Sequence, residues 1–82
     1  MAMYDPHPGT TFEQALKALK DRFPEGNIEH HPQGGNVFIS LPLKGGGTFR
    51  AGLTWQQAKY LAYSQLTGDD LQDQRFPAEW PS

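Results

Sequence analysis

The sequence contains no cysteine and no long apolar run, and its charges nearly balance. The lack of cysteine excludes a disulfide framework, thiolate zinc sites and thiol catalysis. No stretch approaches the roughly 18 apolar residues of a membrane span, and residues 1–9 lack the basic start and apolar stretch of a signal peptide. Seven basic and nine acidic residues give a formal net charge of −2, which argues against a strongly basic nucleic-acid binder. We therefore expect a soluble, cytoplasmic protein with no membrane partner.

A chain of 82 residues has room for one small domain, which must rely on a packed core or on a partner. The pattern divides it into an extended N-terminal arm over residues 1–9, an α+β domain over 10–68 and a C-terminal tail over 69–82. The tail contains Phe76 and Trp80. Either it folds back and Trp80 fills part of the core, or these rings remain available to a partner.

Two amphipathic helices are predicted. The first follows a cap at Thr10 or Thr11, with Glu13 and Gln14 in position for a capping box, and ends before Pro24. Its apolar stripe has helical spacing and consists of Phe12, Ala15, Leu16, Leu19 and Phe23.

The second helix follows a cap at Thr54, with Gln57 three residues later, and is expected to run to about Leu66 and stop at Gly68. Its predicted apolar face consists of Trp55, Ala58, Leu61, Ala62 and Leu66.

Three short strands are predicted between the helices, over Asn27–His31, Val37–Leu43 and Thr48–Ala51, with Gly52 ending the sheet. Their short connections suit antiparallel hairpins. The predicted fold is therefore α+β with the order α-β-β-β-α, in which two helices pack on one face of a three-stranded antiparallel sheet.

No pattern in the sequence predicts catalysis, a metal or a cofactor. His30 and His31 are adjacent on a strand and so point to opposite faces, where they cannot readily share an ion. The acidic run Asp69, Asp70 and Asp73 lacks the ligand spacing of a calcium loop. The glycines at 45–47 precede a strand rather than a helix, which is typical of a hairpin and not of a phosphate loop. We expect a protein that is not an enzyme.

Aromatic residues beyond the needs of a small core are the strongest functional signal. Such residues often serve interfaces, because they bury much area at little entropic cost. We predict a protein–protein interaction module that acts as an adaptor or inhibitor, as phage accessory proteins do, and binds another protein or a second copy of itself. The predicted partner-binding residues are Trp55, Tyr60, Tyr63, Phe76 and Trp80.

Gly52, Thr54, Ala58, Lys59 and Ala62 lie at and after the start of the second predicted helix. This pattern resembles the corresponding part of the double-stranded-RNA-binding domain, a family that also has the αβββα order. The two lysines that reach phosphates in the family fall on Trp55 and Gln56, and the loop over residues 30–35 is similar in composition but not in order. The resemblance covers about residues 10–67.

The resemblance implies an alternative function, the binding of double-stranded nucleic acid. This family reads phosphates across a groove with a basic cluster, and each lost phosphate contact weakens binding. The residues that would bind nucleic acid here are His30, His31, Lys44, Arg50 and Lys59.

Overall fold

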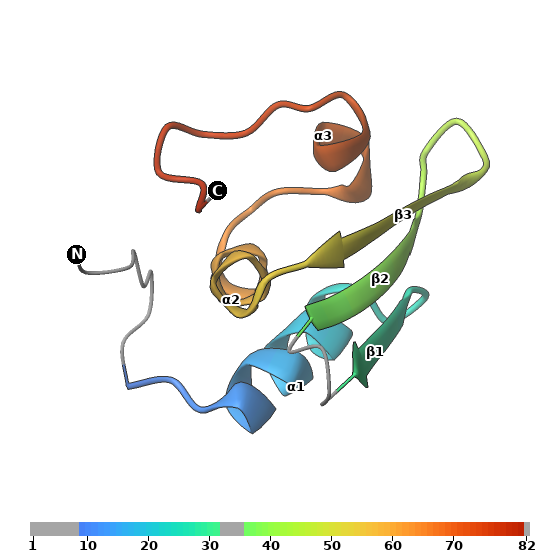
Figure 1. The fold of residues 1–82 in the computed structure, drawn as a ribbon. Helices are drawn as coiled ribbons and strands as arrows, with labels where there is room; N and C mark the ends of the chain where they lie inside the picture. The colour runs from blue at the N-terminus through green and yellow to red at the C-terminus, as the bar shows by residue number, and fades with distance from the viewer. Residues whose placement is uncertain (1–8, 32–35, 82) are drawn as a thin grey trace.

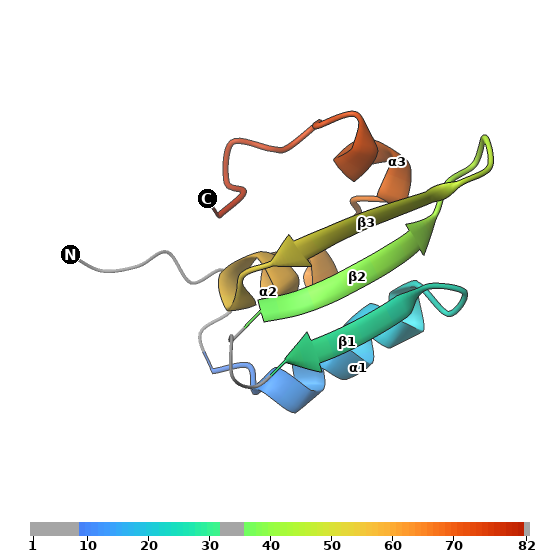
Figure 2. The same ribbon diagram turned by 45° about the vertical axis from the view of Figure 1, so that its right-hand side comes forward.

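The computed structural model describes residues 9–31 and 36–81, and its elements follow the order α1, β1, β2, β3, α2, α3. Their bounds are Phe12–Arg22 for α1, Asn27–His31 for β1, Asn36–Pro42 for β2, Thr48–Leu53 for β3, Trp55–Tyr63 for α2 and Gly68–Gln72 for α3. The strands form one antiparallel sheet in the order β1-β2-β3. Helices α1 and α2 lie together on one face of this sheet (Figures 1 and 2). The predicted fold class is confirmed, with one further short helix.

Some predicted segments lie outside the described residues, namely residues 1–8 of the N-terminal arm and residues 32–35 of the turn between β1 and β2. No helix in the described part of the chain is long and apolar enough to cross a membrane.

Both predicted capping boxes are present. The hydroxyl of Thr11 accepts a hydrogen bond from the Gln14 backbone N–H, and the Gln14 side chain accepts one from the Thr11 N–H. Thr54 and Gln57 repeat this arrangement at the start of α2. Each box satisfies two backbone donors that have no partner within the helix, so the helix starts are encoded locally.

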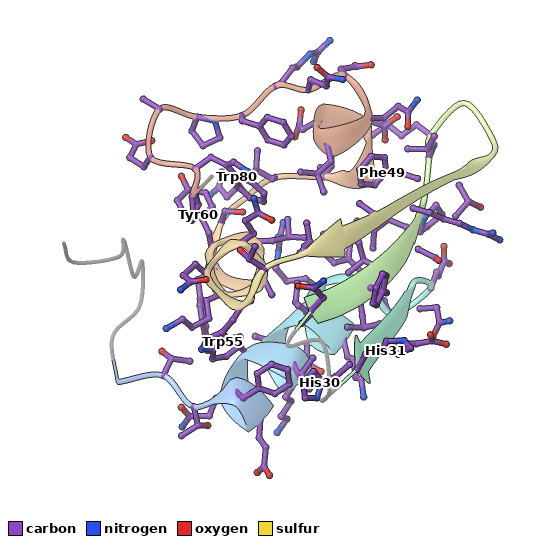
Figure 3. All side chains as sticks on the ribbon, in the orientation of Figure 1. His30, His31, Phe49, Trp55, Tyr60 and Trp80 are labelled. Atoms are coloured by element: carbon purple, nitrogen blue, oxygen red, sulfur yellow. The ribbon has the colours of Figure 1, made fainter. Side chains whose placement is uncertain are left out.

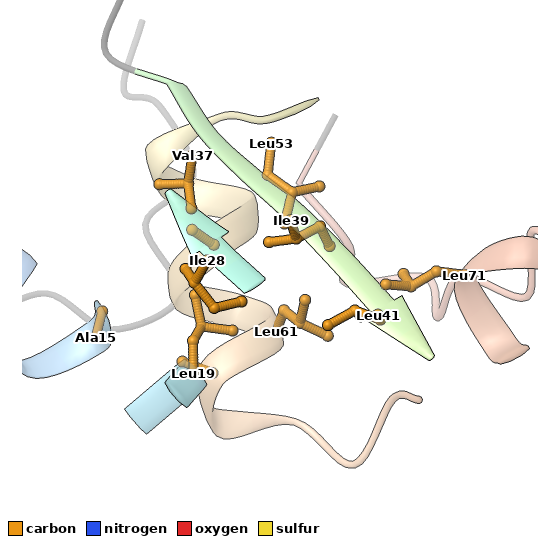
Figure 4. Packing of buried hydrophobic residues seen from close by; sticks show 11 residues of the cluster. Ala15, Leu19, Ile28, Val37, Ile39, Leu41, Leu53, Leu61 and Leu71 are labelled. Atoms are coloured by element: carbon orange, nitrogen blue, oxygen red, sulfur yellow. The ribbon is translucent and has the colours of Figure 1, made fainter. Parts of the chain in front are cut away.

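The core lies between the sheet and the two long helices (Figure 4). Side chains in β2 alternate between buried and solvent-facing positions, because successive side chains of a strand point to opposite faces. The buried hydrophobic residues are Ala15, Leu19, Ile28, Val37, Ile39, Leu41, Leu53, Ala58, Leu61, Ala62 and Leu71. No helix of the described residues covers the opposite face of the sheet (Figure 2).

The sequence predicts that Gly52 ends the sheet, but β3 continues through Gly52 to Leu53. Gly52 pairs with Phe38 of β2, and a Cβ atom on Gly52 would lie 3.1 Å from the Phe38 ring. The glycine is therefore needed to make space for a cross-strand ring, and it does not break the sheet.

Helix α2 ends at Tyr63, three residues before the predicted end at Leu66. The Ser64 hydroxyl donates to the Leu61 carbonyl and accepts from the Leu66 N–H, which turns the chain out of the helix. The guanidinium of Arg22, at the end of α1, donates to the carbonyls of Leu61 and Leu66, the latter at 2.7 Å. Partial burial of this group lowers the pKa of Arg22 from its usual value.

The sequence pattern predicts a helix stop at Gly68 and does not predict α3. Instead, Thr67 caps this five-residue helix, and its hydroxyl accepts from the Asp70 N–H while the Asp70 carboxylate accepts from the Thr67 N–H at 3.0 Å. Gly68 is buried with its Cα against β2, where an added Cβ would lie 3.1 Å from Leu41. The helix is too short to show an apolar period, and Leu71 is its only buried hydrophobic residue.

Replacement of Arg22 by Ala should lower the free energy of unfolding by roughly 2–4 kcal/mol, because two carbonyls lose a charged donor. The exposed neighbour Lys20 is a matched control, and Lys20→Ala should change stability by less than about 0.5 kcal/mol. Urea denaturation followed by circular dichroism measures both values. Equal losses for the two variants would show that Arg22 does not join the helices.

The stability of α3 should depend on pH. Hydrogen bonds from the Thr67 backbone and side chain lower the pKa of Asp70 below its usual value. Ionised Asp70 therefore stabilises the fold above the unfolded-state pKa of about 3.9, and the effect is lost as the pH falls through the lower folded-state pKa.

Melting temperatures of wild type and Asp70→Asn, measured from neutral pH down to about pH 2, test this expectation. Wild type should be the more stable protein at neutral pH, and the difference should shrink below about pH 4. The exposed Asp21 provides the control variant Asp21→Asn. A difference that stays constant over the whole pH range would contradict the role of the ionised cap.

Candidate functional site

Helix α2 divides the predicted aromatic residues between its two sides (Figure 3). Trp55 lies on the side of α1, with its ring centroid 4.5 Å from that of Phe12, and the Lys59 Nζ lies 5.0 Å from the Trp55 centroid. Tyr60 lies on the other side of the helix, beside Trp80 of the tail. The structure therefore does not join Trp55 to the other predicted partner-binding residues.

The C-terminal tail returns to α2 through Trp80. The Trp80 ring meets the Tyr60 ring edge-on, at 5.4 Å between centroids and 81° between planes, and it stacks on Phe76 at 5.0 Å and 18°. The Gln57 side-chain amide donates to the Pro81 carbonyl at 2.9 Å, and Pro81 is buried. Tail residues up to Pro81 are thus attached to α2 by a ring contact and a hydrogen bond.

The segment between α3 and Trp80 is also ordered by local contacts. Gln74 has φ = 58°, in the left-handed region, and the Arg75 N–H donates to the Asp70 carbonyl at 2.9 Å. Arg75 Nη2 lies 3.2 Å from Asp73 Oδ2, and Nη1 lies 3.9 Å from Asp70 Oδ1. These contacts reverse the chain after α3, so that Phe76 can stack on Trp80.

Ring contacts join three of the predicted residues, Tyr60, Trp80 and Phe76. We call these three residues and Tyr63 the aromatic face. Tyr60 and Tyr63 are three residues apart on α2 and are therefore neighbours on the helix surface. Tyr63 is 46% exposed and Phe76 is 45% exposed, whereas Tyr60 and Trp80 are half-buried. Trp80 packs against the hydrophobic core and also supports the exposed ring of Phe76.

The residues of the alternative nucleic-acid site do not come together. Lys59 is only 3% exposed, and Lys44 lies in the β2–β3 connection, where its N–H donates to the Asp69 carboxylate at 3.3 Å. Arg50 is exposed on the face of the sheet that carries no helix. No continuous positive stripe joins these three residues.

The two predicted histidines point to opposite faces of β1, as expected from their adjacent positions. His30 packs on Phe12 of α1 at 4.0 Å between centroids, and His31 meets Phe38 of β2 edge-on at 4.7 Å. Among the described residues, no group of three or more His, Asp or Glu side chains is placed to hold a metal ion.

Phe38 is not among the predicted site residues, although it is 43% exposed on the open face of the sheet. A signal was present, because the strand alternation already placed this aromatic ring on the polar side of β2. Its neighbours in the sheet on that face include Ser40 and Arg50. Phe38 thus lies in polar surroundings, with the His31 ring beside it.

A hollow of about 260 Å³ opens between the end of α1, the end of β2 and the start of α3. Arg22 and Lys44 contribute basic groups to its wall, and Glu25 and Asp69 contribute acidic ones. The Arg22 guanidinium already donates to two carbonyls, and the Asp69 carboxylate accepts from the chain at Lys44. The charges balance, so the hollow does not favour a ligand of either sign.

The aromatic face is therefore the strongest candidate site in the described part of the chain, because it combines large exposed rings with a supported geometry. No family model, curated protein or solved structure matches this chain.

Proposed function

We propose that this protein is a small protein-binding module that acts as an adaptor or inhibitor, and that the aromatic face contacts its partner. The observation that carries the proposal is the series of ring contacts from Tyr60 through Trp80 to Phe76, with Tyr63 three residues from Tyr60 on α2. Tyr and Trp are enriched where interfaces bind most strongly, and clustered exposed rings are typical of interaction sites.

The contacts that hold the rings in place favour the aromatic face as the binding surface. Binding costs less free energy when the contact groups are already ordered. Trp80 is held between Phe76 and Tyr60, and the Gln57–Pro81 hydrogen bond fixes the end of the described tail. The two exposed rings therefore belong to a preordered surface and not to a loose segment.

The open face of the sheet is a weaker candidate. Its one large exposed hydrophobic side chain is Phe38, which packs over Gly52 and against His31. Single exposed apolar residues are common on protein surfaces and need no functional explanation. Phe38 nevertheless provides a matched control, because its exposed fraction is almost equal to that of Phe76.

Site-specific crosslinking tests the proposal. Benzoylphenylalanine placed at Tyr63 or Phe76 should form a covalent adduct with one specific protein in cells that naturally produce this chain, and the same group at Phe38 should not. Mass spectrometry of the adduct identifies the partner, and sedimentation distinguishes a second copy from another protein. Equal adducts from all three positions would contradict the proposed face.

Substitution at the same positions should weaken binding of the identified partner. Phe76→Ser and Tyr63→Ser should each raise the Kd by about tenfold or more, as expected for ring contacts at the centre of an interface. Phe38→Ser should change it by less than about twofold. Circular dichroism should show an unchanged fold for all three variants, because each ring is nearly half exposed.

A further inference from the structure

We propose that the partner presents an arginine-rich polypeptide segment, whose guanidinium groups stack on the aromatic face and pair with carboxylates of the C-terminal segment. This inference rests on the proposed function and names the chemistry of the partner.

Charge is distributed unevenly along the chain. Residues 67–81 contain four acidic side chains and one basic side chain, a net charge of −3, whereas residues 1–66 contain six basic and five acidic ones. The acidic segment supplies Phe76 and Trp80, so two of the four rings lie within the most negative part of the chain. Electrostatic complementarity favours a positively charged partner at such a surface.

The local ion pairs do not remove this charge. The net charge of −3 already includes Arg75, which contacts Asp73 and Asp70. Asp73 remains half exposed, and Glu79, the residue before Trp80, is exposed. These carboxylates are accessible in the same segment as the rings.

The same charge disfavours two other occupants. A second copy of the chain would bring two segments of charge −3 together, and like charges across an interface oppose association. The phosphates of a nucleic acid would be repelled in the same way. The negative charge therefore favours a basic protein segment over a second copy of the chain and over a nucleic acid.

The rings of the aromatic face favour arginine over lysine as the basic residue of the partner. A guanidinium is planar, stacks on aromatic faces and pairs with carboxylates through two parallel hydrogen bonds, whereas an ammonium is a compact and strongly hydrated charge. The chain uses cation–ring contacts within its own fold, since Arg22 Cζ lies 4.8 Å from the Phe23 centroid and Lys59 lies over Trp55. The ring of Phe76 is also exposed, and the carboxylates of Asp73 and Glu79 are each three residues away in the sequence.

Peptide binding to the full chain tests this inference. The probe is a fluorescein-labelled peptide of repeated Gly-Ser-Arg units, and the comparison peptides replace each arginine by lysine or by glutamate. Anisotropy should show that the arginine peptide binds at least about threefold more tightly than the lysine peptide, and that the glutamate peptide does not bind. Binding should weaken as the salt concentration rises from about 0.1 M to about 1 M, since the Debye length falls from about 10 Å to about 3 Å.

Variants of the chain identify the groups that bind. Phe76→Leu keeps an apolar side chain but removes the ring, so it should abolish the preference for arginine over lysine. Glu79→Gln and Asp73→Asn should each raise the Kd of the arginine peptide by about threefold. The control is Glu29→Gln, at an exposed residue of the open sheet face, and it should leave this Kd unchanged. Phe38→Leu is the control for the ring.

Absence of arginine-peptide binding would overturn the inference, as would equal binding of the lysine peptide or wild-type behaviour of Phe76→Leu. Binding of duplex RNA that Phe76→Leu abolishes would overturn it as well. The crosslinks from Tyr63 and Phe76 separate this failure from failure of the proposed function. If specific adducts form but the arginine peptide does not bind, the aromatic face is an interface for a partner of different chemistry.

Discussion

The Arg22 guanidinium connects three parts of the chain, and the position of the C-terminal tail depends on this connection. It lies at the end of α1 and donates to carbonyls at the end of α2 and in the segment that leads to α3. A helix terminus leaves carbonyls without partners, and here a side chain from another helix satisfies them. The direction in which the chain leaves α2 then determines where Thr67 can begin α3. Only after that turn can Trp80 return to Tyr60, so the aromatic face is a product of the helix junction.

Local signals were sufficient to predict most of the fold. The capping boxes at Thr11 and Thr54 fix both helix starts within four residues of sequence, and the bounds of β1 and the facing of β2 follow from turn residues and alternation. The end of α2 combines a local signal with a distant one, because Ser64 turns the chain while Arg22, which lies 39 residues from Leu61 in the sequence, donates to the Leu61 carbonyl. The contribution of Arg22 could not be predicted from local sequence. The strand conformation of Gly52 depends on a ring in the neighbouring strand, which no local propensity reveals.

The candidate site was predictable as a list of residues but not as a surface. Composition identified the rings, and their arrangement depends on contacts between distant segments. Trp55 and Tyr60 are five residues apart on one helix, yet one packs toward α1 and the other toward the tail. The burial of Lys59 has the same origin, since it lies four residues after Trp55 and on the same side of α2. Whether a helical residue faces the core or a partner is decided by the elements packed around it.

The exposed reversal at Arg75 has a consequence for the integrity of the chain in a proteolytic environment. Its side chain is 70% exposed, and the next residue is Phe76, so the peptide bond between them suits a trypsin-like protease. One hydrolytic cut there would detach two of the four rings in a single event, while the sheet and both long helices would keep their covalent continuity. Because Trp80 also packs against the hydrophobic core, the same cut would release a core contact together with the exposed ring of Phe76.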